Sequence, residues 1–519
     1  MMLWGNHKSQ KLRGVGAESG LLVKLTRISC GLLVGMILAL TWVPIRAVAF
    51  SLLGPYADWM DIQKGYAQPG DIGGPMNIGE GYRWNIPIIT YGFSRSFLDY
   101  FGSNGVAAVE SAIAVLNQLP PASTVDPQNY TNYAWGYNSF PGTPLLLDLK
   151  SQALNTLLEE MGLADPARWT FCIRDFAPAG SNYSFYVIPR NFDPGTGLSS
   201  PYVNGTLFTY RINQYTTVPS PGQTFCDAFE HLIDPLQPFY TTATAQGPYR
   251  YNTFLTGLSR DDVGGLRYLL SGSQIRRENL LPDVHLVSTN SGTLAQTAYR
   301  PGVEKITFIR HPTAVASGEF RSFTNRWTDI YFAPDYPAYQ NVERVTAHPD
   351  IMFNGQDLGV SAGWTRTGTS NWANNGTLNG NPGGAGPGVI QPPIIITFNT
   401  VGPFYANYPA SPPDEPTSIK YSGWGSFDGS TNAPFIYPDI GITFQPTQVH
   451  FRLTVGGLTH DFMWKLPGPP YGRFWFQTAT NLTDWTMLTT VTNSGAEFDY
   501  QFSSLPDEPN RFFRTAPVQ

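Results

Sequence analysis

Apolar residues recur at helical spacing in three segments of this 519-residue chain, and this scarcity of helices limits its fold more than any other feature. Two of the segments are residues 103–121 and 144–166, each with one apolar stripe. The third is residues 259–270, where Ser259 is followed three residues later by Asp262, the pattern of a capping box. We therefore expect three helices in a chain built otherwise of strands and turns.

The composition agrees with short strands and many turns. The chain has 52 Gly and 44 Pro, and only 13% of its residues are charged, while 14% are aromatic. Its length exceeds what one hydrophobic core usually serves, which predicts several domains. We predict an α+β domain at residues 50–272, then a β-rich region at 283–445 that contains a Gly/Asn-rich loop at 367–388, and a C-terminal β-sandwich module at 446–519.

The first 49 residues have the pattern of an export signal. Basic residues up to Arg27 precede an uncharged apolar run at residues 28–43, and the small residues of "AVA" (47–49) predict a cut before Phe50. The run is shorter than the roughly 20 residues that cross a bilayer, so we expect cleavage, with a retained membrane anchor as the alternative. The sequence thus predicts secretion to the periplasm, the outer surface or the medium, with membrane contact only through this signal.

The charge of the mature chain argues against one class of partner. Removing residues 1–49 takes away six of the 32 basic and one of the 38 acidic residues, which leaves a formal net charge of −11. Such an acidic surface repels phosphate backbones, so we do not expect nucleic acid as a partner.

Two cysteines remain in the mature chain, because Cys30 lies within the apolar run. An even number in an oxidising compartment predicts a disulfide between Cys172 and Cys226, with two separate buried thiols as the alternative. Two cysteines alone make a poor zinc site.

Catalytic motifs are hard to find in this sequence. A zinc-protease helix needs two His at i and i+4, but the histidines of the mature chain lie at least ten residues apart. The motif G-x-S-x-G of serine hydrolases does not occur either. One weak candidate cluster consists of Asp227, Glu230 and His231, which would share a face if the segment were helical, and otherwise form a solvated turn. We predict no catalytic residue, no metal ligand and no cofactor, although carboxylates and distant histidines leave a metal site open.

Three aromatic residues in loops rich in Gly, Ser and Asn are candidates for contact with carbohydrate. They are Trp372, Tyr421 and Trp424. A flat apolar ring with polar edges can stack on a sugar ring. The alternative is that each side chain packs over a sheet edge.

Three segments resemble parts of a matrixin-type metzincin protease domain. "IPIITYGFS" and "GVAAVESAIAVLNQL" are similar to its first strand and helix, and "LSRDDVGGLRYLL" is similar to its closing helix. In that family a central helix carries His-Glu-x-x-His followed by Gly. The nearest counterpart here is "NTLLEEMGL", in which Asn155, Thr156 and Glu159 occupy the His, Glu and His positions. The resemblance therefore implies a degenerate, inactive relative without the zinc motif.

A second resemblance covers most of the mature chain. "FWFQTATNLTDWTMLTTV" and "NRFFRTAP" resemble a C-terminal β-module of secreted proteins of environmental bacteria, and "TGLSRDDVGGLRYL" and "HPDIMFNGQDLG" are similar to features of the same proteins. It implies export and a multi-domain, β-rich chain, and it implies no activity.

These observations together lead to one functional expectation and two alternatives. We expect an exported, non-enzymatic binding or structural protein of the cell surface or its surroundings. A divergent secreted metal-dependent hydrolase of protease type is the first alternative. A surface protein that binds polysaccharide is the second.

Overall fold

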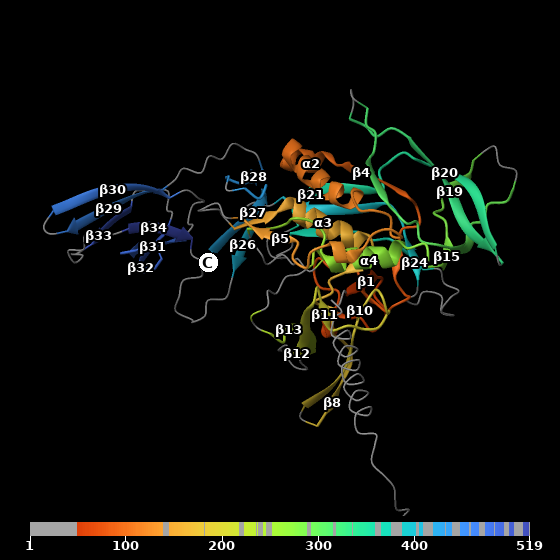
Figure 1. Cartoon of the computed structure of the whole chain (residues 1–519), viewed down its shortest axis with the longest axis horizontal. Coiled ribbons are helices and arrows are strands. Elements are labelled where there is room, and N and C mark those ends of the chain that lie inside the picture. Colours follow the sequence, from red (N-terminus) through yellow and green to blue (C-terminus); the bar gives the residue numbers. More distant parts are fainter. Residues whose placement is uncertain are drawn as a thin grey trace, which may run out of the picture. The chain divides into compact units, whose positions relative to one another are not determined.

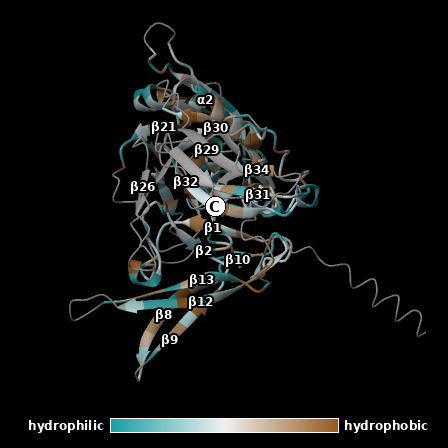
Figure 2. Cartoon of the chain, turned by 90° about the vertical axis from the view of Figure 1, so that its left-hand side faces the viewer, coloured by the Kyte–Doolittle hydropathy of each residue, from teal (hydrophilic) through white to brown (hydrophobic). Residues whose placement is uncertain are grey.

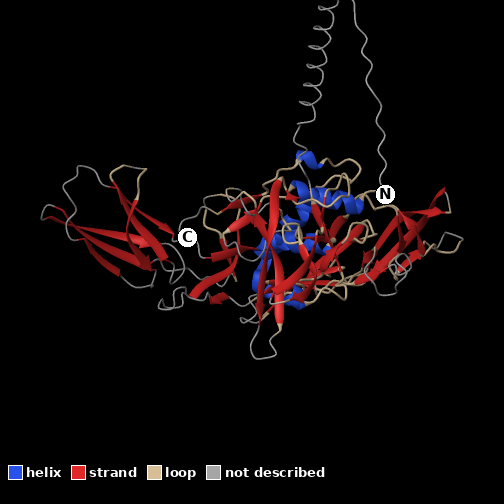
Figure 3. Cartoon of the chain, turned by 90° about the horizontal axis from the view of Figure 1, so that it is seen from below, coloured by secondary structure: helices blue, strands red, loops and turns tan. Residues whose placement is uncertain are grey.

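The computed structural model falls into two units, residues 1–47 and 48–519, and every described residue lies in the second. The described residues are 49–138, 145–180, 182–216, 223–234, 236, 242–244, 252–287, 292–314, 318–334, 336–358, 365–374, 387–400, 404–407, 419–430, 432–438, 447–455, 458–466, 473–481, 483–492, 498–502 and 512–517. Within these ranges the fold is mostly β and contains three α-helices (Figures 1 and 3). The predicted export signal lies outside the described residues except for Ala49.

A five-stranded mixed sheet carries the core. Its strands, in spatial order, are β18 (Thr307–Arg310), β4 (Ile88–Phe93), β21 (Ile351–Gln356), β25 (Ile394–Asn399) and β22 (Arg366–Gly368). The first four run parallel to one another, and the edge strand β22 is antiparallel to β25. β4 and β25 are mostly apolar and almost completely buried, as expected for strands that are covered on both faces, whereas buried and half-buried residues alternate in β21.

The three helices are α2 (Arg95–Asn117), α3 (Leu149–Glu160) and α4 (Arg260–Leu270). The predicted capping box of α4 is confirmed, with Ser259 and Asp262 bonded reciprocally. The helix expected at 103–121 begins earlier, because Ser94 caps α2 and the chain continues through a kink at Gly102. The helix expected at 144–166 is shorter, since residues 145–148 form a strand and Gly162 takes a left-handed φ of 98°.

A second five-stranded sheet is antiparallel throughout. Its strands, in order, are β15 (Arg276–Asn279), β17 (Thr297–Arg300), β19 (Phe323–Ala333), β20 (Tyr336–Thr346) and β16 (Val284–Leu286). Val284 and Val342 on its inner face belong to the main hydrophobic core. Along β20 buried residues alternate with residues of the outer face, which are exposed or half-buried.

The remaining strands form smaller sheets and hairpins. Before residue 400, a four-stranded sheet consists of β1 (Phe50–Gly54), β2 (Gly74–Met76), β7 (Leu163–Ala164) and β10 (Asn191–Phe192). Two three-stranded sheets consist of β3 (Tyr82–Arg83), β23 (Trp372–Asn374) and β24 (Gly388–Ile390), and of β11 (Tyr202–Val203), β12 (Thr206–Thr216) and β13 (Thr224–Leu232). Two strand pairs are β5 (Trp135–Tyr137) with β14 (Thr253–Leu255), and β8 (Cys172–Ala179) with β9 (Asn182–Ile188). Apolar side chains of the hairpins β8–β9 and β12–β13 share a small core cluster around Ile173. Figure 2 shows these two hairpins next to each other, with hydrophobic residues in brown.

Strands from both sides of the expected boundary at 272–283 share one sheet. β4 lies before the boundary, and β18, β21 and β25 lie after it. The Gly/Asn-rich segment 367–388 also contains β23 and contributes to β22 and β24, while its residues 375–386 lie outside the described part. Parallel pairing joins segments far apart in the sequence, which local composition does not reveal.

All regular elements among the described residues of the C-terminal segment are strands. Near its start lie β26 (Phe404–Asn407), β27 (Ile419–Ser426) and β28 (Phe435–Tyr437), with β6 (Leu145–Asp148) paired to β27. Among the described residues of 446–519 there are two three-stranded sheets. One consists of β30 (Leu458–Leu466), β29 (Thr447–Val455) and β33 (Phe498–Phe502), and the other of β32 (Thr486–Thr492), β31 (Arg473–Ala479) and β34 (Phe512–Pro517). That these sheets pack as a sandwich stays a prediction. Among the described helices, none is long and apolar enough to cross a membrane.

Candidate functional site

The helix α3 is buried along almost its whole length, including its polar side chains. Its first turn is capped by Asp148, whose Oδ2 accepts a hydrogen bond from the Ser151 backbone at 2.9 Å. Gln152, Asn155 and Thr156 are also almost completely buried. Because buried polar groups cost free energy unless they are bonded, this helix needs partners from the elements around it.

Arg366, on the edge strand β22, donates hydrogen bonds to three side chains of α3. Its Nη1 donates to Glu159 Oε2 at 2.9 Å, and its Nε donates to Gln152 Oε1 at 3.2 Å. Its Nη2 also contacts Asn155 Oδ1. Residues 152, 155 and 159 lie on one helix face, so a single planar guanidinium satisfies three side chains at once.

This face includes the positions at which the matrixin resemblance would place zinc ligands. Asn155 and Glu159 bind Arg366, and the Asn155 amide also donates to the Ala243 carbonyl at 2.7 Å. Thr156, at the position of the general base, donates its hydroxyl to the Gln152 carbonyl at 2.9 Å. These residues do not fit a catalytic zinc, because no imidazole is present and a cationic side chain occupies the polar face. No group of three or more His, Cys, Asp or Glu among the described residues could hold a metal ion.

Glu160, next to this cluster, is an unusual buried acid. It is fully buried, and neither carboxyl oxygen has a hydrogen-bond partner within the described structure. Burial raises the pKa of Glu160 well above its ordinary value, and the negative charge of Glu159 raises it further, although Arg366 opposes both. Burial therefore favours the neutral form of this carboxyl. Gly368 gives it room, since a Cβ there would lie 2.4 Å from Glu160 Oε1.

A second charged cluster is centred on Arg168. Its guanidinium donates to both oxygens of Asp71, at 2.7 and 2.9 Å, and to the Gly65 carbonyl at 3.0 Å. Burial raises the pKa of Asp165 to about 7, with Glu230 adding to the shift. Burial also raises the pKa of Asp227 to about 6, while the charge of Arg168 lowers it.

The weak candidate cluster of the sequence is thus only partly assembled. The segment is the strand β13, so both the helix and the solvated turn expected from the sequence are wrong. Asp227 and Glu230 influence each other and Arg168, but His231 is exposed and lies opposite Thr209 of β12. The strand period of two sends residues 227 and 230 to opposite faces, which a helical reading of the spacing missed.

The predicted disulfide is not formed. Cys172 and Cys226 are separate, buried free thiols. Cys172 lies on β8 and its Sγ donates to the Ile188 carbonyl at 3.4 Å, whereas Cys226 lies on β13 and faces the Gln63 carbonyl at 3.5 Å. Burial raises the pKa of each thiol to about 11, so both stay protonated at neutral pH.

The aromatic residues proposed for carbohydrate contact are not available as a group. Trp424 is 1% exposed, and its Nε1 donates to the Asn399 carbonyl at 2.7 Å. Its ring packs edge-on against Phe398 with centroids 5.5 Å apart. Trp372 is half-buried against Tyr82, and the side chain of Tyr421 lies outside the described part. The Gly-rich sequence around Trp424 belongs to the strand β27, so the prediction of an exposed loop is wrong there.

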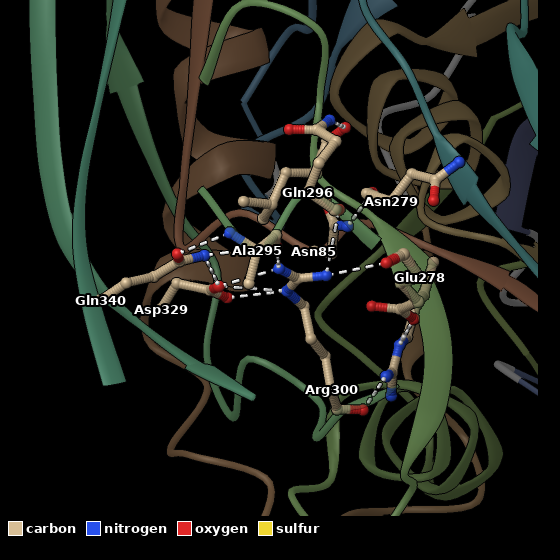
Figure 4. Close-up of polar contacts among 10 residues, drawn as sticks. Asn85, Glu278, Asn279, Ala295, Gln296, Arg300, Asp329 and Gln340 are labelled. Atoms are coloured by element: carbon tan, nitrogen blue, oxygen red, sulfur yellow. Dashed lines mark hydrogen bonds and ion pairs between the residues drawn. The ribbon is translucent and has the colours of Figure 1, made fainter. Parts of the chain in front are cut away.

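A buried polar network anchors the inner face of the second sheet (Figure 4). Arg300 donates to Asp329 at 2.9 Å and to the Glu278 carbonyl at 2.7 Å, and Gln340 donates to Asp329 at 2.7 Å. Glu278 in turn pairs with Arg83 at 2.6 Å, and both of these side chains are completely buried. The residues of this network come from segments far apart in the chain, and β15, which reads Arg-Arg-Glu-Asn, has no apolar alternation that would mark it as a buried strand.

The outer face of the same sheet exposes large apolar side chains. Tyr299, Ile330, Tyr339 and Val345 are 49%, 42%, 64% and 53% exposed, respectively. Between them, polar side chains pair across β19 and β20, Thr328 with Asn341 at 3.0 Å and Arg326 with Glu343 at 2.9 Å. We call this set the outer tyrosine face. Large exposed apolar side chains on one face of a sheet, with polar pairs between them, are a candidate interaction surface.

Comparisons with known proteins add no identity. No family model, no curated protein and no solved structure matches the chain.

Proposed function

We propose that this chain is an exported, non-enzymatic protein that binds a partner at the cell surface or in the surrounding medium. The observation that carries the proposal is the position of Arg366. Its guanidinium occupies the polar face of α3, where a protease of the resembled type would need a metal ion and a general base. A tightly bonded cation there leaves α3 a structural role.

The outer tyrosine face supports the binding role. Its inner side is held by the Arg300 network, so the face is a rigid platform that needs little ordering when it binds. Tyrosines supply large contact area with few rotatable bonds, which makes them frequent anchors of interfaces.

The catalytic part of the proposal is tested on the secreted full chain, purified without chelators. We expect zinc and calcium far below one ion per chain by elemental analysis, and no turnover of a mixed fluorogenic peptide library. One tightly bound zinc per chain, with peptide hydrolysis that chelation removes, would favour the metal-dependent hydrolase instead.

Carbohydrate binding is a second candidate function, now located on the outer tyrosine face rather than at Trp372 and Trp424. The charges of Arg326 and Glu343 cancel each other there, which suits a neutral polysaccharide. We expect retention of the chain on insoluble polysaccharide and loss of retention in Tyr339→Ala. Tyr186→Ala is the control, because Tyr186 is equally exposed, at 64%, on a different hairpin. Equal retention of both variants would contradict this candidate.

A further inference from the structure

The segment at the predicted export cut is part of the folded core. Ala49 is 0% and Phe50 2% exposed. Phe50 begins β1, which pairs with β10, β2 and β7. The Phe50 ring packs against Tyr268 of α4, with centroids 4.9 Å apart. A chain that starts at Phe50 would therefore have its first residue held by packing, rather than free in solvent.

Asp261, in the first turn of α4, lies beside this segment. It is 1% exposed, and its Oδ2 accepts a hydrogen bond from the Asn204 backbone at 2.5 Å. Its Oδ1 has no partner in hydrogen-bond geometry among the described residues. Ala49, Phe50 and Asp261 line the same narrow gap, which is too tight to hold a water molecule. The Asp261 carboxyl thus lies beside the start of β1, where the backbone N–H of Ala49 is the nearest group of that strand segment.

The surroundings of Asp261 favour a cation at this place. Burial raises the pKa of Asp261 well above its ordinary value, while the backbone N–H groups of Asn204 and Ala49 act in the opposite direction. The positive end of the α4 dipole also favours an ionised carboxylate here. A buried carboxylate gains most from a positively charged donor, which replaces the hydration that it has lost.

We propose that removal of the export signal supplies this cation: the α-ammonium of Phe50 forms an ion pair with Asp261 in the space that Ala49 occupies before cleavage. Hydrolysis of the Ala49–Phe50 bond consumes one water, and it leaves a carboxylate on the released signal and an ammonium on Phe50. One residue step of about 3.8 Å separates the two positions. Gly265, one turn beyond Asp261, allows Phe50 to lie close to α4, since a Cβ at Gly265 would lie 3.0 Å from Phe50 Cβ.

Removal of the export signal would therefore add an ion pair that holds β1 against α4. Before cleavage the groups of β1 beside Asp261 are neutral amides, and after cleavage one of them is a charged ammonium. Arg260 and Asp262 of α4 are charged neighbours of Asp261 in both states. The inference is independent of what the protein binds, because it concerns maturation of the fold. It does require the cut to fall before Phe50, so N-terminal sequencing of the secreted chain comes first. A first residue elsewhere overturns the proposal.

The test compares two chains that differ only at the start, one beginning at Phe50 and one extended to begin at Val48, each with and without Asp261→Asn. We expect D261N to lower the Tm of the Phe50 chain by at least 2 °C more than that of the extended chain, an approximate scale for one ion pair. Asp262→Asn is the matched control. It breaks the capping box in both chains and should lower both Tm values equally. An equal effect of D261N on the two chains overturns the proposal.

A second measurement keeps the proposal testable if the Asp261 variant does not fold. In the unmodified Phe50 chain, NMR titration of the α-amine should give a pKa above about 9, compared with about 7.7–8.0 for a free N-terminus. A value in the ordinary range, with Phe50 confirmed as the first residue, overturns the ion pair.

Discussion

Arg366 and Glu159 form an ion pair with an N···O distance of 2.9 Å, although 207 residues separate them in the sequence. The pair is largely buried, with side-chain exposures of 12% and 17%. The ion pair joins β22, the edge strand of the five-stranded mixed sheet, to the helix α3. The same guanidinium satisfies Gln152 and Asn155, so it is the main polar tie of α3 to the sheet.

Arg366→Ala should destabilise the protein severely. It leaves Glu159 as an uncompensated buried charge and leaves two amide oxygens without their donor, a change that costs about 3–5 kcal/mol in comparable buried pairs. Urea unfolding at pH 7 measures the loss. Arg326→Ala is the control, because Arg326 is 67% exposed in its pair with Glu343 and should contribute about 0–1 kcal/mol. Similar losses for both variants would contradict the role given to Arg366.

Glu160→Gln should stabilise the protein at pH 8 and change little at pH 4. The folded-state pKa of Glu160 is raised, so the folded protein keeps a proton that the unfolded chain releases above about pH 4.3. Stability is therefore full at low pH and falls as the pH rises toward the folded-state pKa. Gln mimics the neutral acid and removes that loss. Urea midpoints at several pH values measure the difference, with Glu343→Gln at the surface as control. A variant that is less stable than the parent at pH 8 would show that Glu160 is ionised in the fold.

The sequence predicted local features better than contacts between distant segments. The capping box at Ser259 and Asp262 was predictable because both partners lie within one helical turn. The predominance of strands followed from turn-forming residues and scarce helical spacing. The contact of Arg366 with α3 was not predictable, since nothing local marks one arginine in a Gly- and Asn-rich stretch as the partner of a helix two hundred residues earlier.

The wrong predictions of a disulfide and of an exposed loop at Trp424 have a related cause. An even number of cysteines is a count, and it contains no information about whether two strands present their Sγ atoms to each other. Trp424 was placed in a loop because Gly and Ser surround it, whereas these small residues allow its strand to lie against other elements. A Cβ at Gly425 would meet Leu146 Cδ1 at 2.8 Å.

Cys172 and Cys226 should remain free thiols in the secreted protein. Both are buried and their pKa values lie near 11, so neither thiolate is present in quantity at neutral pH. We expect no labelling by iodoacetamide in the native protein and labelling of both cysteines after unfolding in guanidinium without reductant. An unfolded chain that is labelled only after reduction would establish the disulfide that the sequence favours.

Gly368→Ala should destabilise the protein, because Gly368 leaves space for the carboxyl of Glu160. An added Cβ would lie 2.4 Å from Glu160 Oε1 and 3.0 Å from Ile72 Cγ2. Glu160 is fully buried and cannot swing into solvent, so the strand or the helix must shift, at a cost of about 1–3 kcal/mol for an overpacked site. Gly257→Ala is the control, since a Cβ there meets nothing within 4 Å and should change stability by less than about 0.5 kcal/mol. Combining Gly368→Ala with Glu160→Ala removes the clashing carboxyl, so the double variant should lose less than the sum of the two single losses. Additive losses would show that the two residues are not in contact.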